Sequence, residues 1–243
     1  MDFRPASMYR ETMDFWVQEC PHCGYIKTRL DQPSNITQEE ILKTHEEIES
    51  GFDWNRAFAR KLAGLEKVSP SMFGAMLAEP AYRRRLSSDG QSEEKERFLW
   101  SMEWERTYAM RFAKFGAMLA KSGRHDEAAM QFLSVAWYFD DENNEDAATH
   151  WRKAAIEQME IMRQRRKKPP YYEMLICAYA DMLRRSGDFQ AVINLHENEL
   201  SEAVHVRMIK YQKELSMQGD RAAHKIAETG DSSYAEKGMY FGV

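Results

Sequence analysis

The chain has 243 residues, of which 30% are charged and 43% apolar, and its formal net charge is −5. This composition is typical of a folded protein with a sizeable core, and the acidic balance argues against nucleic-acid binding by bulk electrostatics. No run approaches the roughly 18 consecutive apolar residues that a membrane span requires. Three cysteines provide no disulfide framework, and the first residues lack the layout of a signal peptide, so we expect a cytoplasmic protein with no membrane segment.

The first predicted unit, residues 1–35, is an irregular segment with the sequence Cys-Pro-His-Cys at 20–23. Short strands are predicted on both sides of it, around 13–18 and 25–29. A Cys-x-x-Cys sequence occurs both in redox dithiols and as one half of a tetrahedral zinc site. The chemistry expected of this segment therefore depends on what surrounds the two thiols.

The second predicted unit, residues 36–91, is a helical linker or subdomain. Its first helix begins at Thr37, which with Glu40 has the pattern of a capping box, and apolar residues follow at helical spacing. A second helix is predicted from Asp53 to about residue 65. The sequence Ser-Ser-Asp-Gly-Gln at 87–91 is typical of a loop.

The third predicted unit, residues 92–228, is helical almost throughout. Its helices are separated by short breaks such as Ser-Gly-Arg and Ser-Gly-Asp, and short loops imply antiparallel neighbours. The predicted helices cover residues 92–122, 125–140, 144–167, 170–186, 188–200 and 202–218, with a weaker one near 220–228. The remaining residues, 229–243, are predicted to be a loose tail.

Two segments of the third unit, 112–132 and 175–195, are similar to each other. Each contains a Ser-Gly turn, and Gly123 and Gly187 lie 64 residues apart, close to two units of about 32 residues. Glycine adopts the left-handed conformation of such a turn at little cost, and the small Gly116 allows two helices to approach closely. The pattern predicts repeated helix-turn-helix hairpins.

The first of these segments resembles the tetratricopeptide (TPR) family, whose units of about 34 residues are helix-turn-helix hairpins. In the second segment the match is degenerate, since Ala180 and Val192 replace the small residues of the family and His196 stands where a large apolar residue is usual. The segment that begins at Asn144 could be the second helix of a shortened unit between the two. The resemblance covers residues 103–218 and implies a mainly α protein of antiparallel hairpins stacked as a solenoid, which presents a surface to a protein or peptide partner.

The sequence Cys-Pro-His-Cys-Gly-Tyr is similar to a zinc-ribbon knuckle, in which Pro and Gly support a tight turn around the thiolates. Structural zinc takes four ligands, and after Cys20 and Cys23 the nearest further candidate is His45 on the first predicted helix. Cys177, on a predicted core face, is expected to be a small buried residue rather than a ligand.

The layout of a CPHCGY sequence followed by TPR-like helices resembles a bacterial domain family of unknown function. The resemblance implies an earlier Cys-x-x-Cys that supplies two further thiolates, but no cysteine precedes Cys20 in this chain. Three outcomes stay open: a zinc ion shared by two chains of a homodimer, a site completed by His45 or another residue, or an empty relic.

The alternative is a thiol-disulfide enzyme with Cys20 as its nucleophile. The sequence Asp-Phe-Trp at 14–16 has the spacing to Cys20 that thioredoxin-like proteins have, and Cys-Pro-His-Cys resembles the pair in the oxidising members of that superfamily. Against it, Pro33 follows closely, and residues 37–228 are predicted to be almost wholly helical, whereas the thioredoxin fold alternates strands and helices.

Two further features are expected to be structural. The basic run at 163–168 could contact phosphates, but cations at the C-terminus of a long helix complement its dipole, so nucleic-acid binding is a weaker alternative. An aromatic stripe is expected in the core and comprises Trp100, Trp104, Tyr108, Phe112 and Phe115. Because no catalytic set or phosphate-binding glycine motif appears, we expect a non-catalytic interaction scaffold with zinc as a structural cofactor.

Overall fold

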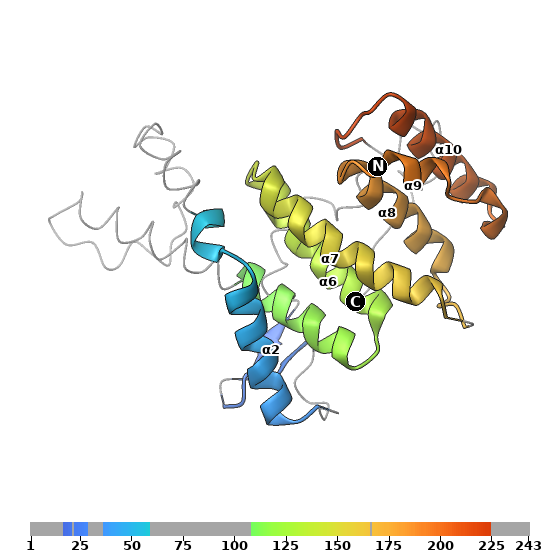
Figure 1. The fold of residues 1–243 in the computed structure, drawn as a ribbon. Coiled ribbons are helices and arrows are strands. Elements are labelled where there is room, and N and C mark those ends of the chain that lie inside the picture. The colour runs from blue at the N-terminus through green and yellow to red at the C-terminus, as the bar shows by residue number, and fades with distance from the viewer. Residues whose placement is uncertain (1–16, 21, 29–35, 59–107, 166, 225–243) are drawn as a thin grey trace, which may run out of the picture.

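The computed structural model describes residues 17–20, 22–28, 36–58, 108–165 and 167–224. This part of the chain is mainly helical, with one small antiparallel hairpin before the first helix (Figure 1). None of its helices is long and apolar enough to cross a membrane. The loop and helix predicted between 59 and 107, and the tail predicted at 229–243, lie outside the described residues.

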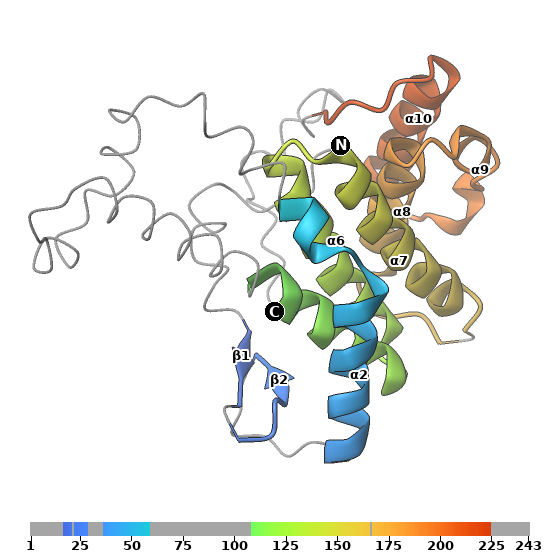
Figure 2. The same ribbon diagram turned by 60° about the vertical axis from the view of Figure 1, so that its left-hand side comes forward.

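The N-terminal hairpin consists of β1 (Gln18–Glu19) and β2 (Ile26–Lys27), with Gln18 opposite Lys27 and Glu19 opposite Ile26. β2 lies within the strand predicted around 25–29, whereas β1 shares only Gln18 with the strand predicted around 13–18, of which residues 13–16 lie outside the described residues. Val17 and Ile26 are buried in the same apolar cluster as the helices, and Figure 2 shows the hairpin beside α2. The hairpin is therefore packed onto the helical part of the protein.

Helix α2 (Gln38–Gly51) begins with the predicted capping box. The Thr37 hydroxyl accepts the Glu40 N–H at 3.2 Å, and the Glu40 carboxylate accepts the Thr37 N–H at 2.8 Å. After α2, residues 54–58 are again helical. Asn144 donates from its side chain to the Ala57 carbonyl at 2.9 Å, which ties this segment to the helices that follow.

The central helices pack as antiparallel neighbours. A helix at 108–121 is followed by α6 (His125–Asp141) and α7 (Glu145–Arg163), and three residues join α6 to α7. A Cβ atom at Gly116 would lie 2.9 Å from the Phe132 ring, so the predicted close approach at Gly116 is confirmed. Of the predicted aromatic stripe, the described members, Tyr108, Phe112 and Phe115, are buried.

The same turn closes four helices. Gly123, Asn143, Gly187 and Gly219 all have positive φ values. In each turn this residue donates its N–H to the carbonyl three residues earlier, and the next residue donates to the carbonyl five residues earlier. These two bonds define a Schellman motif. The turns predicted at Gly123 and Gly187 are confirmed, and Asn143 shows that an asparagine can take the same role.

The C-terminal part contains α8 (Tyr172–Arg185), α9 (Phe189–Ile193), the 3₁₀ helix η3 (Glu197–Glu199) and α10 (Ala203–Met217). The predicted continuous helix over 188–200 is therefore wrong. After Ile193 the chain turns, and distant residues hold it, since Glu197 accepts from Lys213 and Glu199 accepts from Tyr172. The weaker helix predicted near 220–228 does not form over its described residues, 220–224.

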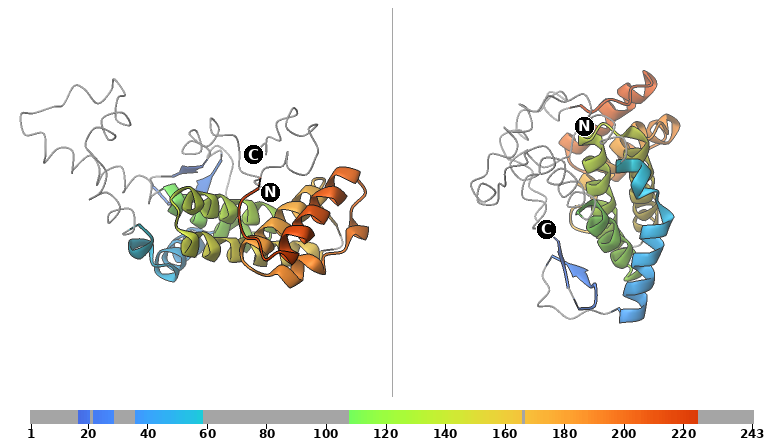
Figure 3. Two further views of the ribbon diagram at one scale, coloured as in Figure 1. Left: turned by 90° about the horizontal axis from the view of Figure 1, so that it is seen from above. Right: turned by 90° about the vertical axis from the view of Figure 1, so that its left-hand side faces the viewer.

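The structure describes every residue between Gly123 and Gly187 except residue 166. These described residues contain three helices, α6, α7 and α8. Two complete hairpins would place four helices there. The 64-residue spacing thus corresponds to a longer, incomplete unit rather than to two equal ones. Figure 3 shows the resulting array, with α2 and the hairpin at one end and α10 at the other.

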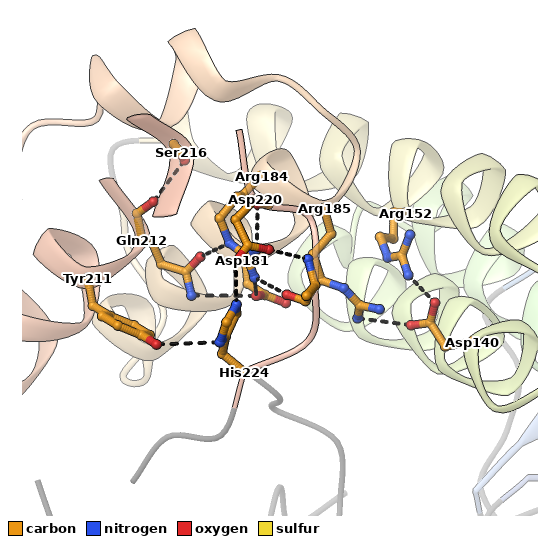
Figure 4. Close-up of polar contacts among 11 residues, drawn as sticks. Asp140, Arg152, Asp181, Arg184, Arg185, Tyr211, Gln212, Ser216, Asp220 and His224 are labelled. Carbon is orange, nitrogen blue, oxygen red and sulfur yellow. Dashed lines mark hydrogen bonds and ion pairs between the residues drawn. The ribbon is translucent and has the colours of Figure 1, made fainter. Parts of the chain in front are cut away.

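A buried ion network joins α6, α7 and α8 (Figure 4). Asp140 on α6 contacts Arg152 on α7 and forms an ion pair of 2.9 Å with Arg185 on α8. All three side chains are at most 9% exposed. Burial and the neighbouring charge of Arg185 lower the pKa of Arg152, and Asp140 opposes both effects.

A second part of the network centres on Arg184, which is fully buried. Its guanidinium donates to Gln212 on α10 at 2.6 Å and to Asp181 at 2.9 Å. It also donates to the backbone carbonyls of Asp220 and Ala222, at 2.7 and 2.9 Å. One side chain thereby attaches both α10 and the segment after it to α8.

Replacing Asp140 by Asn should destabilise the fold by about 3–5 kcal/mol, because two buried guanidinium groups would lose their shared counter-charge. The free energy of unfolding, measured by urea denaturation, tests this. Asp188→Asn is the matched control, since Asp188 is an exposed helix N-cap, where Asn is equally good. Equal stabilities of the two variants would contradict the prediction.

Helix α10 receives its N-terminal cap from another helix. Its own N-cap residue, Glu202, makes no side-chain capping bond. The Glu173 carboxylate on α8 instead accepts the N–H groups of Ser201 and Glu202, at 2.9 and 3.1 Å, and lies 3.0 Å from Nδ1 of His205. The Ser201 hydroxyl, followed by these backbone N–H groups, lowers the pKa of Glu173 to about 2.

The cap at Glu173 should make stability depend on pH. Because the folded-state pKa lies below the ordinary value of 4.5, the stabilisation is fully present above that pH and is lost as the pH falls towards 2. Glu173→Gln should cost about 1 kcal/mol at pH 7, and the difference in Tm from the wild type should shrink between pH 5 and 3. The exposed Glu157→Gln serves as control, and a difference that stays constant with pH would refute the cap.

Candidate functional site

Cys20 and Cys23 lie at the tip of the N-terminal hairpin. The Cys20 N–H donates to the Tyr25 carbonyl at 2.8 Å, and the Gly24 N–H donates to the Cys20 carbonyl at 2.9 Å. Gly24 has a φ of 71°, a conformation in which a side chain would be strained. These two backbone bonds close a tight loop that carries both Cys20 and Cys23.

The turn makes the Cys20 thiol more acidic than an ordinary cysteine. The backbone N–H groups of His22 and then Cys23, followed by the Cys23 thiol, lower the pKa of Cys20, and slight burial opposes them. Both cysteines are free and half-buried. Because the thiolate is the form that binds metals and attacks disulfides, the turn favours either chemistry.

His45, the third predicted ligand, lies on α2 against the hairpin. A Cβ atom at Gly24 would lie 2.9 Å from Cε1 of His45, so the ring packs directly on the turn. Burial, and then the charge of Lys114, lower the pKa of His45, which favours the neutral ring. Its Nε2 is buried and has no hydrogen-bond partner. An orphaned imidazole nitrogen of this kind has the chemistry of a zinc ligand.

The structure thus places the three predicted ligands in one region but not around one point. The two cysteines share one turn, and His45 lies beside it. Within the described ranges, no three His, Cys, Asp or Glu side chains are arranged so that they could hold a metal ion. Cys20 and Cys23 therefore form a two-donor half site.

Ion pairs that the sequence did not suggest attach this region to the helix at 108–121. Glu19, next to Cys20, lies 3.5 Å from Arg111, and Glu49 on α2 lies 2.6 Å from Lys114. Lys114 is buried apart from 8% of its surface. A lysine among the apolar residues of this helix could have indicated a buried ion pair. Its partner, Glu49, could not be identified from the sequence, because it lies 65 positions away.

Cys177 belongs to the core, as expected. It is completely buried, and its thiol contacts the backbone carbonyl of His205 at 3.8 Å. Burial raises the pKa of the Cys177 thiol well above its ordinary value. Cys177, His205 and Glu173 therefore resemble a catalytic set only in composition, because the thiol faces the backbone of His205 and stays protonated.

A second candidate site is a pocket of about 680 Å³ between the end of α7, α8 and η3. Two tyrosines of α8 and two cations form its walls. The Arg163 guanidinium lies 5.1 Å from the ring centroid of Tyr179, and Lys168 Nζ lies 4.6 Å from that of Tyr172. The Tyr172 hydroxyl donates to Glu199 at 2.8 Å. Burial, and then this bond to Glu199, raise the pKa of Tyr172 to about 12, so the hydroxyl remains a donor.

The two cations of this pocket come from the basic run at 163–168. Lys168 donates to the backbone carbonyl of Arg163 at the end of α7, and Arg163 lies 3.5 Å from Glu199. A cation at this position satisfies a carbonyl that the helix leaves free. The structural role expected for the run is thus present at Lys168.

No protein-family model matches the chain, and neither the curated proteins nor the solved structures include a significantly similar one.

Proposed function

We propose that this chain is a non-catalytic interaction module of the TPR-like type and that a peptide segment of a protein partner binds in the pocket between α7, α8 and η3. The observation that carries the proposal is the grouping of Tyr172, Tyr179 and Arg163 around one concave surface. Tyrosine and arginine are the residue types that, with tryptophan, dominate the energetics of protein interfaces.

The chemistry of the pocket suits a peptide. The tyrosine rings offer flat apolar surface, while Lys168 and Arg163 offer donors at its rim. Glu160 and Glu199 add acceptors on the same walls. Such a mixture can bind an apolar side chain together with the polar backbone on either side of it.

The TPR-like part of the proposal rests on the turns and on one close contact. Gly123 and Gly187 close their helices with the same pair of hydrogen bonds, and Gly116 lies against Phe132 as the small residue of a TPR hairpin would. The three helices between the turns depart from a regular repeat. We therefore propose a shortened array, whose irregular junction at α8 and η3 supplies the pocket.

Arg163→Ala should weaken the partner about 10- to 30-fold, since an interface arginine on a tyrosine ring contributes about 1.5–2 kcal/mol. The partner would be recovered by cross-linking from the native lysate and its affinity measured by titration calorimetry. Lys153→Ala removes an exposed cation from the same helix, α7, and should leave the affinity unchanged. If the two variants bind the partner with equal affinity, the partner does not bind in this pocket.

A second candidate function, thiol-disulfide exchange, is favoured by the lowered pKa of Cys20. The Cys20 thiolate would attack a substrate disulfide, and Cys23 would then displace the second substrate thiol, which oxidises the pair and reduces the substrate. Insulin reduction in the presence of dithiothreitol should then exceed the uncatalysed rate and fall to it in Cys20→Ser. An ordinary Cys20 pKa, determined from the pH dependence of alkylation, together with no turnover would end this candidate.

A further inference from the structure

We infer that a second copy of this chain completes the metal site, so that one zinc ion is held by Cys20 and Cys23 of each of two chains. This inference does not depend on the pocket between α7, α8 and η3. It concerns the hairpin at the opposite end of the helical array (Figure 3).

The hairpin tip already has the form of half a zinc site. The Cys20 N–H on the Tyr25 carbonyl and the Gly24 N–H on the Cys20 carbonyl hold both cysteines on one tight loop, and both cysteines are free and partly exposed. Structural zinc is bound by four N or S donors in a tetrahedron. The tip therefore supplies two of the four ligands, and a second pair of donor atoms must complete the tetrahedron.

The chain cannot supply that second pair as thiols. It contains three cysteines, and the third, Cys177, is completely buried on α8. Among the described residues, no third His, Cys, Asp or Glu side chain joins the tip to form a metal site. Four thiolates around one ion therefore require Cys20 and Cys23 from two molecules.

The tip also permits two copies to approach. Residues 20–25 include no carboxylate or ammonium group. The nearest acidic side chain, Glu19, is 3.5 Å from Arg111 of its own chain. Two tips related by a two-fold axis through the metal would place their four sulfurs at the corners of a tetrahedron, which is the self-complementary contact of a symmetric dimer.

His45 defines the competing arrangement. Its buried, unpartnered Nε2 could join Cys20 and Cys23 of the same chain in a three-ligand site. That site would require the His45 ring and the cysteine turn to move towards each other. The site shared by two chains requires no change in the conformation of the hairpin tip. The two arrangements differ in metal content per chain, in mass and in their dependence on His45.

The experiment is elemental analysis and light scattering on the full chain, purified with a thiol reductant and without chelator. We expect one zinc ion per two chains and a mass twice the 28.5 kDa of one chain. Chelation should yield metal-free monomers, and added zinc should restore the dimer. The wild type is used throughout this step, so a folding defect cannot explain the result.

The variants then identify the ligands. Cys20→Ser with Cys23→Ser should lose both zinc and the dimer, while Cys177→Ser and His45→Ala should keep both. A monomer with one zinc ion that is lost in His45→Ala would overturn the inference in favour of a site within one chain. Protein that binds no zinc, or a dimer that survives chelation, would overturn it as well. None of these results bears on partner binding by the Arg163 pocket.

Discussion

The Arg184 guanidinium is the interaction on which the C-terminal half of this protein depends. It is fully buried, and its donors meet Gln212, Asp181 and two backbone carbonyls after α10. Removing a charge from water costs several kcal/mol, which is recovered only when its donors are satisfied. Here the acceptors come from α8, from α10 and from the segment that follows α10. All hydrogen bonds of the guanidinium are therefore made only when these three parts are in place.

The arrangement around Arg184 determines where the candidate pocket lies. Arg185, the next residue, joins α8 to Asp140 on α6, and Glu173 at the other end of α8 caps α10. Because α8 is held at both ends, its tyrosines, Tyr172 and Tyr179, have fixed places beside the end of α7. The short η3 segment then brings Glu199 onto Tyr172, which closes one wall of the pocket.

Local patterns predicted much of the fold. The capping box at Thr37, the left-handed turns at Gly123 and Gly187 and the close contact at Gly116 each depend on a few neighbouring residues. The helix over 188–200 failed for the opposite reason. Its residues have adequate helix propensity, but contacts of Glu197 and Glu199 with distant helices hold a different conformation. Propensity is a weak preference, and tertiary contacts override it.

The candidate sites divide in the same way. The sequence by itself determined that Cys20 and Cys23 would share a tight turn, because Gly24 follows them, and that four thiolates cannot come from one chain. Only the tertiary structure decided that His45 packs on that turn and that the basic run forms the wall of a pocket. Turn geometry is encoded by adjacent residues, whereas the partners of a buried ring or guanidinium are chosen by packing between helices far apart in the chain.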